Sequence, residues 1–159
     1  MGTIRIVRGT GSGPTAMAAY DAALADGNVH NYNLVSVSSV VPANATIEVV
    51  GDAPDLGPAG ERLTVVEGRA TVGPDRPDRA VASIGWDRVP EGPGIFYESS
   101  GTDPEGVSER VERGLAAGRE LREWAFGETG REVVIANPDP DRYTAAVVLA
   151  VYGESTPLL

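Results

Sequence analysis

The chain has 159 residues, 13 basic against 23 acidic side chains, and a net charge of -10. This length suits a single domain with its own hydrophobic core, covering residues 1–159, and the acidity argues against non-specific binding to nucleic acid. No apolar run reaches the roughly 18 residues of a membrane span, so we expect a soluble, cytoplasmic protein that does not bind membranes.

The alternation of apolar and polar residues predicts many strands and two helices. A strand over 4–7 leads into a glycine-rich turn over 9–13 and a helix over 15–26, and a strand over 33–41 and a loop over 52–60 follow. The remaining predicted elements are strands over 46–50, 62–66, 69–72, 80–86, 94–98, 132–136 and 143–152, and a second helix over 105–126. With no internal repeat and no linker, this order predicts one α+β domain.

Several kinds of chemistry are excluded by the residues that the chain lacks. Every basic residue is arginine, and there is no cysteine, so neither a lysine Schiff base to pyridoxal phosphate nor a thiolate nucleophile is possible. The one histidine, His30, cannot build a multi-histidine metal site, and its polar turn favours a solvated loop residue over a catalytic one. We therefore expect no pyridoxal phosphate and no metal. An enzyme with this composition must use carboxylates, hydroxyls, amides or arginines, or make its own cofactor.

The acidic, lysine-free composition also bears on the source of the protein. Many carboxylates keep a protein hydrated at very high salt, where their mutual repulsion is screened. A halophilic source is one interpretation, and a GC-rich genome that favours arginine over lysine is the other.

The glycine-rich segment Gly11-Ser-Gly-Pro-Thr-Ala16 fits the G-x-G-x-x-A fingerprint of dinucleotide-binding folds. However, the strand predicted over 33–41 has no acidic residue for the ribose, and the later chain does not repeat βαβ units. A tight connection between a strand and a helix is the favoured interpretation.

Two carboxylates stand beside apolar residues. Asp21 lies along the helical stripe of Met17, Tyr20 and Leu24, and it is either a solvated residue at the edge of the stripe or a partly buried partner for a cation. Glu98 ends an apolar strand, where burial can raise the pKa of a glutamate until it serves as a general acid; the alternative is a solvated charge.

The serine pair in Val35-Ser-Val-Ser-Ser-Val-Val-Pro42 interrupts a strand pattern, because Ser39 falls on the valine side. Ser39 could be a small strand residue bonded to a carbonyl. Alternatively, its hydroxyl could attack the carbonyl of Ser38, and the resulting ester could eliminate to leave an N-terminal pyruvoyl group. That second hypothesis needs a constrained peptide and a donor for the developing oxyanion.

The segment Asn31–Pro42 resembles the cleavage motif of pyruvoyl-dependent arginine decarboxylases, whose pattern is N-L-x-x-V-S-S followed by two hydrophobic residues and proline. Three further segments follow the family's order, and they are the strand with its glycines over 9–13, the helix over 19–24 and the glutamate segment over 94–101. The resemblance covers nearly the whole chain. It implies a layered α/β sandwich of mixed and antiparallel sheets with two main helices, a homotrimer with active sites between subunits, and a pyruvoyl cofactor.

The resemblance also implies roles for residues. Cleavage between Ser38 and Ser39 would give a β chain of residues 1–38 and an α chain of residues 39–159, with Ser39 becoming the pyruvoyl group. L-arginine would form a Schiff base there and leave as agmatine and CO2, in polyamine or agmatine metabolism. Glu98 would protonate the substrate carbon, and Asp21 would pair with the guanidinium.

Asn33 would assist processing and catalysis, according to the same resemblance. In a straight strand it would stand about 20 Å from Ser39, so a neighbouring subunit would supply it. Ser99 differs from the family's usual aromatic residue after the glutamate, which concerns the pocket wall and substrate preference. The alternatives are a pyruvoyl decarboxylase for another amino acid, and an unprocessed relative that acts as a binding or regulatory subunit.

Overall fold

The computed structural model describes residues 2–159, which contain nine strands and two helices. In chain order they are β1 (Thr3–Gly13), α1 (Ala16–Asp26), β2 (Asn33–Ser36), β3 (Val40–Val41), β4 (Thr46–Gly51), β5 (Arg62–Val72), β6 (Ala80–Arg88), β7 (Gly94–Gly101), α2 (Pro104–Glu120), β8 (Glu128–Ala136) and β9 (Tyr143–Tyr152). The expected α+β class is confirmed. No helix within residues 2–159 is long and apolar enough to cross a membrane.

The strands form two sheets that stack face to face. One sheet has five strands in the order β2-β5-β9-β1-β4, with parallel pairs at both edges and antiparallel pairs in the middle. The other has four antiparallel strands in the order β3-β7-β6-β8. The short strands β2 and β3, which follow each other in the chain, are therefore edge strands of different sheets.

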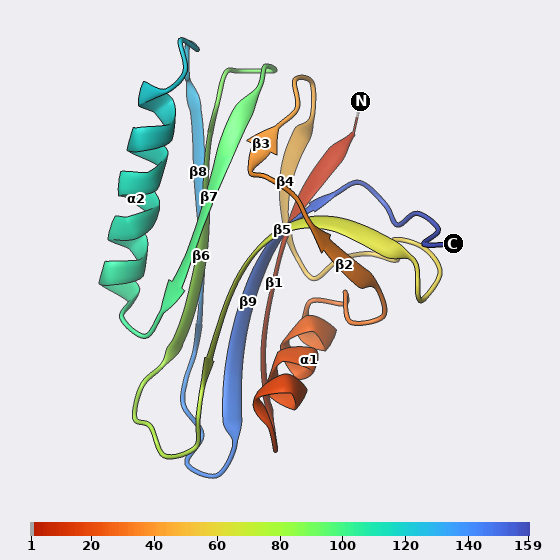
Figure 1. Cartoon of the computed structure of the whole chain (residues 1–159), viewed down its shortest axis with the longest axis vertical. Helices are drawn as coiled ribbons and strands as arrows, with labels where there is room; N and C mark the ends of the chain where they lie inside the picture. Colours follow the sequence, from red (N-terminus) through yellow and green to blue (C-terminus); the bar gives the residue numbers. More distant parts are fainter. Residues whose placement is uncertain (1) are drawn as a thin grey trace.

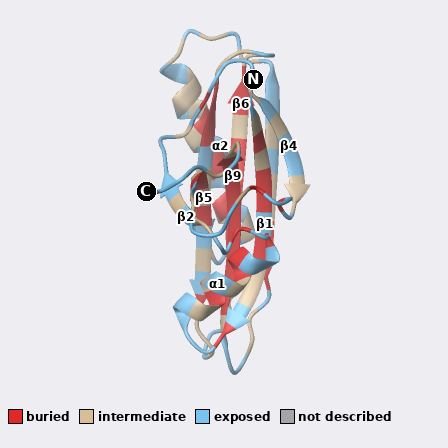
Figure 2. Ribbon diagram, turned by 90° about the vertical axis from the view of Figure 1, so that its right-hand side faces the viewer, coloured by how far each residue is buried: buried red, intermediate tan, exposed pale blue. Residues whose placement is uncertain are grey.

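The layers follow from which side chains each face buries. Residues from both sheets form one apolar cluster between them, including Ile6, Val148 and Ile84. Helix α1 covers the outer face of the five-stranded sheet and α2 the outer face of the four-stranded sheet, so the order of layers is α/β/β/α (Figure 1). Strand β9 is buried on both faces, which explains its nearly continuous apolar sequence (Figure 2).

The predicted glycine-rich turn over 9–13 is wrong, because these residues are the second half of β1 and pair with β9. The glycines let the backbone of α1 lie directly against the strand. A Cβ on Gly11 would lie 2.4 Å from the nitrogen of Ala23, and one on Gly13 would lie 2.8 Å from the carbonyl carbon of Ala18. The fingerprint-like sequence is thus a packing surface for a helix rather than a phosphate-binding loop.

Helix α2 ends at Glu120, earlier than the predicted 126. The backbone turns at Leu121, whose side chain is 82% exposed instead of continuing the buried stripe. Trp124 and Phe126 still pack against the helix and β7, but from a segment outside the helix. The apolar spacing persisted beyond the helix because this following segment covers the same small core.

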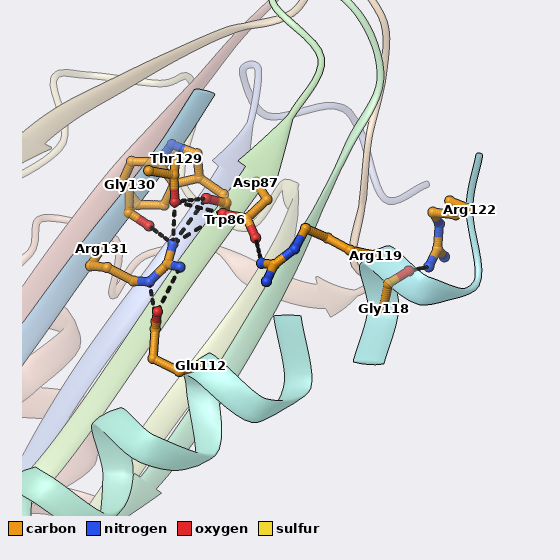
Figure 3. Close-up of polar contacts among 9 residues, drawn as sticks. All are labelled: Trp86, Asp87, Glu112, Gly118, Arg119, Arg122, Thr129, Gly130 and Arg131. Atoms are coloured by element: carbon orange, nitrogen blue, oxygen red, sulfur yellow. Dashed lines mark hydrogen bonds and ion pairs between the residues drawn. The ribbon is translucent and has the colours of Figure 1, made fainter. Parts of the chain in front are cut away.

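An ion-pair network joins α2 to β6 and β8 (Figure 3). The nearly buried carboxylate of Asp87 on β6 pairs with Arg119 of α2 and Arg131 of β8, and it accepts a hydrogen bond of 2.5 Å from the hydroxyl of Thr129. Arg131 also binds Glu112 of α2 through two nitrogens. Because the network sits on the outer face of the four-stranded sheet, it holds the helix in place.

Candidate active site

The chain changes sheet at the serine pair. The predicted single strand over 33–41 is wrong: β2 ends at Ser36 beside β5, and β3 begins at Val40 beside β7. Residues 37–39 cross from one sheet to the other (Figure 1). The Ser38–Ser39 peptide bond thus lies in a short irregular connection between two edge strands, with the side chain of Ser38 exposed and that of Ser39 partly buried.

The backbone of this connection is tightly turned. The Val40 N–H donates to the Ser38 carbonyl oxygen at 2.9 Å, which closes a three-residue γ-turn centred on Ser39. The Phe96 N–H of β7 donates to the Ser39 carbonyl oxygen, also at 2.9 Å. The Ser38 carbonyl therefore already has a hydrogen-bond donor on the oxygen that would become negative in an attack by Ser39.

Glu98 reaches the same place from β7. It shares the face of Phe96, which packs between the sheets, whereas Ile95 on the other face packs against α2. The Ser39 hydroxyl lies 3.5 Å from Glu98 Oε2, at the outer limit of a hydrogen bond. The structure therefore brings together two of the predicted site residues, which are 59 positions apart in the sequence.

Gly68 of β5 makes room for the Glu98 side chain. A Cβ on Gly68 would lie 3.4 Å from Glu98 Cβ and 3.3 Å from the Ser83 carbonyl oxygen. The five-stranded sheet thus helps to position a carboxylate that belongs to the other sheet.

Tyr152, at the end of β9, is a residue near this site that the sequence did not single out. Its hydroxyl donates to the Val40 carbonyl oxygen at 2.8 Å, and its ring packs edge-on against Phe96 with centroids 6.1 Å apart. Burial, and then the negative charge of Glu98, raise the pKa of Tyr152 to about 12. The hydroxyl therefore stays protonated and remains a donor at ordinary pH.

Asp21 and Asn33 do not reach Ser39 within one chain. Asp21 is exposed on α1, which lies on the far side of the five-stranded sheet, and its side chain makes no hydrogen bond or ion pair within residues 2–159. The Asn33 amide donates to the Gly60 carbonyl oxygen at 2.8 Å. His30 is exposed in the turn after α1.

Tyr20, the residue before Asp21 on α1, is held by contacts with two charged side chains of β5. The Tyr20 hydroxyl donates to Glu67 Oε2 of β5 at 2.6 Å, and the Arg69 guanidinium carbon lies 4.5 Å from the centre of the Tyr20 ring. Burial, then the hydrogen bond to Glu67, raise the pKa of Tyr20 to about 12. These contacts fix the rotation of α1 and thereby the direction in which Asp21 faces outward.

Ser99 faces away from Glu98. Its hydroxyl accepts a hydrogen bond of 3.0 Å from Arg110 Nε, which places the side chain against α2. The difference from the family's usual aromatic residue therefore lies on the helix side of β7 in this protomer, not beside Ser39.

No group of three or more His, Cys, Asp or Glu residues within the described part of the chain is arranged to hold a metal ion.

Comparison with known proteins decides which family this is. A family model described as pyruvoyl-dependent arginine decarboxylase matches residues 3–157. The chain belongs to this family. A pyruvoyl-dependent arginine decarboxylase of Halobacterium salinarum is 50% identical over 160 residues, which cover 99% of this chain and 98% of the relative. Those of Methanopyrus kandleri and Pyrococcus furiosus are each 32% identical, over 92% and 88% of this chain and 93% and 89% of the relative.

The predicted resemblance is therefore confirmed. With it are confirmed the enzyme class, a lyase that decarboxylates arginine, and the pyruvoyl group as the cofactor of the pyruvoyl-dependent arginine decarboxylase family. The residues at the serine pair fit such a group. Ser39 carries the hydroxyl from which a pyruvoyl group can form, a carboxylate approaches it, and the neighbouring carbonyl oxygen already accepts a backbone N–H.

Proposed function

We propose that the chain cleaves itself between Ser38 and Ser39 into a β chain of residues 1–38 and an α chain of residues 39–159. The α chain begins with the pyruvoyl group and decarboxylates L-arginine to agmatine and CO2. The observation that carries this proposal is the approach of Glu98 to the Ser39 hydroxyl at a γ-turn whose N–H is bonded to the Ser38 carbonyl oxygen.

The first step of cleavage is an N-to-O acyl shift. Ser39 Oγ attacks the Ser38 carbonyl carbon and its proton passes to Glu98, while the Val40 N–H stabilises the oxyanion. The C–N bond then breaks, the nitrogen of residue 39 takes up a proton, and an ester joins the two residues. The Phe96 N–H strengthens the Val40 donor, because its hydrogen bond to the Ser39 carbonyl polarises the peptide group that carries the Val40 N–H.

The ester then breaks by β-elimination. Residue 39 loses its Cα proton and releases the Ser38 carboxylate as the new end of the β chain, leaving a dehydroalanine. Addition of water and loss of ammonia convert this residue into the ketone. No oxidant is needed, since the elimination and the hydrolysis balance without a change in total oxidation state.

In the processed enzyme the ketone supplies an electron sink for the decarboxylation of the bound amino acid. Glu98 supplies the proton that the substrate carbon needs after CO2 leaves, since it stands beside position 39. Asp21 pairs with the substrate guanidinium through its two carboxylate oxygens.

Asp21 and Asn33 would come from a neighbouring subunit of a homotrimer. The exposed position of Asp21 on the outer face of the sandwich supports this, because an exposed carboxylate can face another copy. So do the valines beside the cleaved bond: Val35 in β2, Val37 in the connection and Val40 in β3 are 41%, 40% and 44% exposed. Such an apolar, unpaired edge is a natural surface for association.

Denaturing mass spectrometry tests the proposal. The wild-type chain should appear as two fragments, the larger of which reacts with a hydrazine or with borohydride, whereas Ser39→Ala should stay intact. Intact wild-type protein after incubation in high salt would overturn the proposal. For the cleaved protein, arginine, ornithine and lysine are assayed side by side, and formation of another amine without agmatine would assign a different substrate. Light scattering of the cleaved protein should give the mass of a trimer.

A further inference from the structure

The residue that becomes the cofactor is attached to a very short edge strand. Strand β3 has two residues, Val40 and Val41, which pair with Ile95 and Gly94 of β7. Once the Ser38–Ser39 bond is cut, position 39 is a free chain end at the beginning of this strand. A chain end on so short an edge strand frays unless something else holds it.

The backbone of β3 shows what needs holding. The Ser39 carbonyl accepts the Phe96 N–H, so it points toward β7. Backbone groups alternate in direction along an antiparallel edge strand, and the N–H and carbonyl of Val40 therefore point away from β7. The Val40 N–H bonds to the Ser38 carbonyl, and this bond changes when the Ser38 carbonyl leaves as a carboxylate.

The remaining outward group, the Val40 carbonyl, is bound by Tyr152 of the other sheet at 2.8 Å. This hydrogen bond crosses from β9 to β3, involves no atom of residue 38, and can persist through cleavage. The ring is held in turn by its edge-on contact with Phe96, the same residue whose N–H binds the Ser39 carbonyl. Tyr152 also stands close enough to Glu98 for the charge of that carboxylate to affect it.

We infer that Tyr152 is a positioning residue for the pyruvoyl group: its hydrogen bond to the Val40 carbonyl holds residue 39 beside Glu98 during self-cleavage and afterwards during decarboxylation. This inference rests on the proposed function. Two hydrogen bonds then hold the backbone that follows the reacting atoms. The Phe96 N–H of the four-stranded sheet binds the Ser39 carbonyl, and the Tyr152 hydroxyl of the five-stranded sheet binds the Val40 carbonyl. The pyruvoyl group is in this way fixed relative to both layers of the sandwich.

Tyr152→Phe tests the inference, because it removes the hydroxyl and keeps the ring. The ester formed during processing has two fates: elimination, which gives the pyruvoyl end, or hydrolysis by water, which leaves an N-terminal serine. The two α chains differ in mass by one ammonia, so intact mass measures their ratio. We expect Tyr152→Phe to process about tenfold more slowly, with a larger share of serine ends than the wild type, as expected for loss of one hydrogen bond.

The second measurement is the rate per pyruvoyl group, with active sites counted by hydrazine. We expect kcat per pyruvoyl to fall about tenfold while the KM for arginine stays within about twofold, since the Tyr152 hydroxyl binds the Val40 carbonyl and binding of the substrate guanidinium is assigned to Asp21. Protein that unfolds before processing would not change either readout, because the mass ratio is taken on processed chains and kcat is counted per pyruvoyl group. Thermal unfolding confirms that both proteins are folded at the assay temperature.

Tyr143→Phe is the matched control, since it removes a hydroxyl from the other end of the same strand, on the face that packs against α1. It should process and turn over like the wild type. If Tyr152→Phe gives the wild-type ratio of ends and the wild-type kcat, the inference is overturned while self-cleavage stands. Failure of the wild type itself to cleave would instead overturn the proposed function.

Discussion

Replacing Gly68 by alanine tests whether the exact placement of Glu98 matters. Gly68 does not adopt a left-handed φ, so the added methyl group brings no backbone strain. The new Cβ would lie 3.4 Å from Glu98 Cβ and 3.3 Å from the Ser83 carbonyl oxygen, and the neighbours must give by a few tenths of an ångström. Because Ser39 Oγ and Glu98 Oε2 are already 3.5 Å apart, a shift of that size that moves Glu98 away from Ser39 takes the pair beyond hydrogen-bond distance.

The expected magnitude follows from this geometry. A misplacement of about 1 Å can cost about 100-fold in rate, so a few tenths should slow both self-cleavage and kcat by about 3- to 10-fold. The overpacking should cost only about 1 kcal/mol of stability, at the low end of such substitutions. The variant should therefore remain folded but process slowly, which separates the effect on the site from an effect on the fold.

The assay follows the appearance of the α chain by mass spectrometry and then kcat per hydrazine-reactive site. Gly73→Ala is the matched control, because a Cβ there would meet only a ring carbon of Tyr143 at an ordinary 3.7 Å. Wild-type cleavage and kcat in Gly68→Ala would refute the idea that this glycine sets the position of Glu98. Equal slowing in both variants would trace the effect to a glycine replacement anywhere in this part of the chain, not to the contact with Glu98.

Three further predictions concern the helices and the substrate. Gly11→Ala would place a Cβ 2.4 Å from a backbone nitrogen of α1, so we expect a loss of about 3 kcal/mol or more in the free energy of unfolding; an unchanged melting temperature would contradict the packing described. Burial raises the pKa of Asp87, but hydrogen bonds from Thr129 and Arg119 outweigh it and lower the pKa below its ordinary 3.8. The stability that Asp87 provides is thus present above pH 4 and lost as the pH falls below about 4. In urea unfolding at pH 7 we expect Asp87→Asn to be less stable by about 2–4 kcal/mol, with a smaller further loss on acidification than the wild type; equal acid sensitivity would contradict this. Asp21→Asn should cleave normally but show a KM for arginine raised about tenfold or more in steady-state kinetics, and an unchanged KM would remove Asp21 from the substrate site.

Most of the secondary structure was predictable because it depends on local pattern. The helix expected over 15–26 is observed as Ala16–Asp26, with Thr15 as its N-cap, and the strand over 143–152 has the predicted bounds. The errors in the predicted elements arise where contacts with a distant part of the chain determine the local structure. Residues 9–13 resemble a turn because glycine favours turns, yet they form a strand whose missing side chains admit the backbone of α1.

Two residues of the candidate site could be singled out from the sequence, whereas the residues that position them could not. Ser39 and Glu98 were identified by residue type and motif, and the structure brings them together. Gly68 and Tyr152 were not, because a glycine inside a strand and a tyrosine at a strand end carry no local sign of function. Their significance depends on which strands of the two sheets face each other, and this information is spread over the whole chain.

The apparently misplaced second serine has a physical explanation in the change of sheet. Alternation predicts that Ser39 continues the face of Val35 and Val37, but the strand ends before it and a new strand begins in the other sheet. The face of Ser39 is instead set by Val41 of β3, which is fully buried between the sheets. Ser39 lies two residues before Val41 and therefore on the same face. A hydroxyl is thereby directed into the sandwich, toward Glu98, while its own peptide bond stays in an exposed γ-turn. A continuous strand could not do both, because its backbone groups would be held in a regular ladder; the break between sheets is what leaves the Ser38 carbonyl outside such a ladder, as the proposed attack requires.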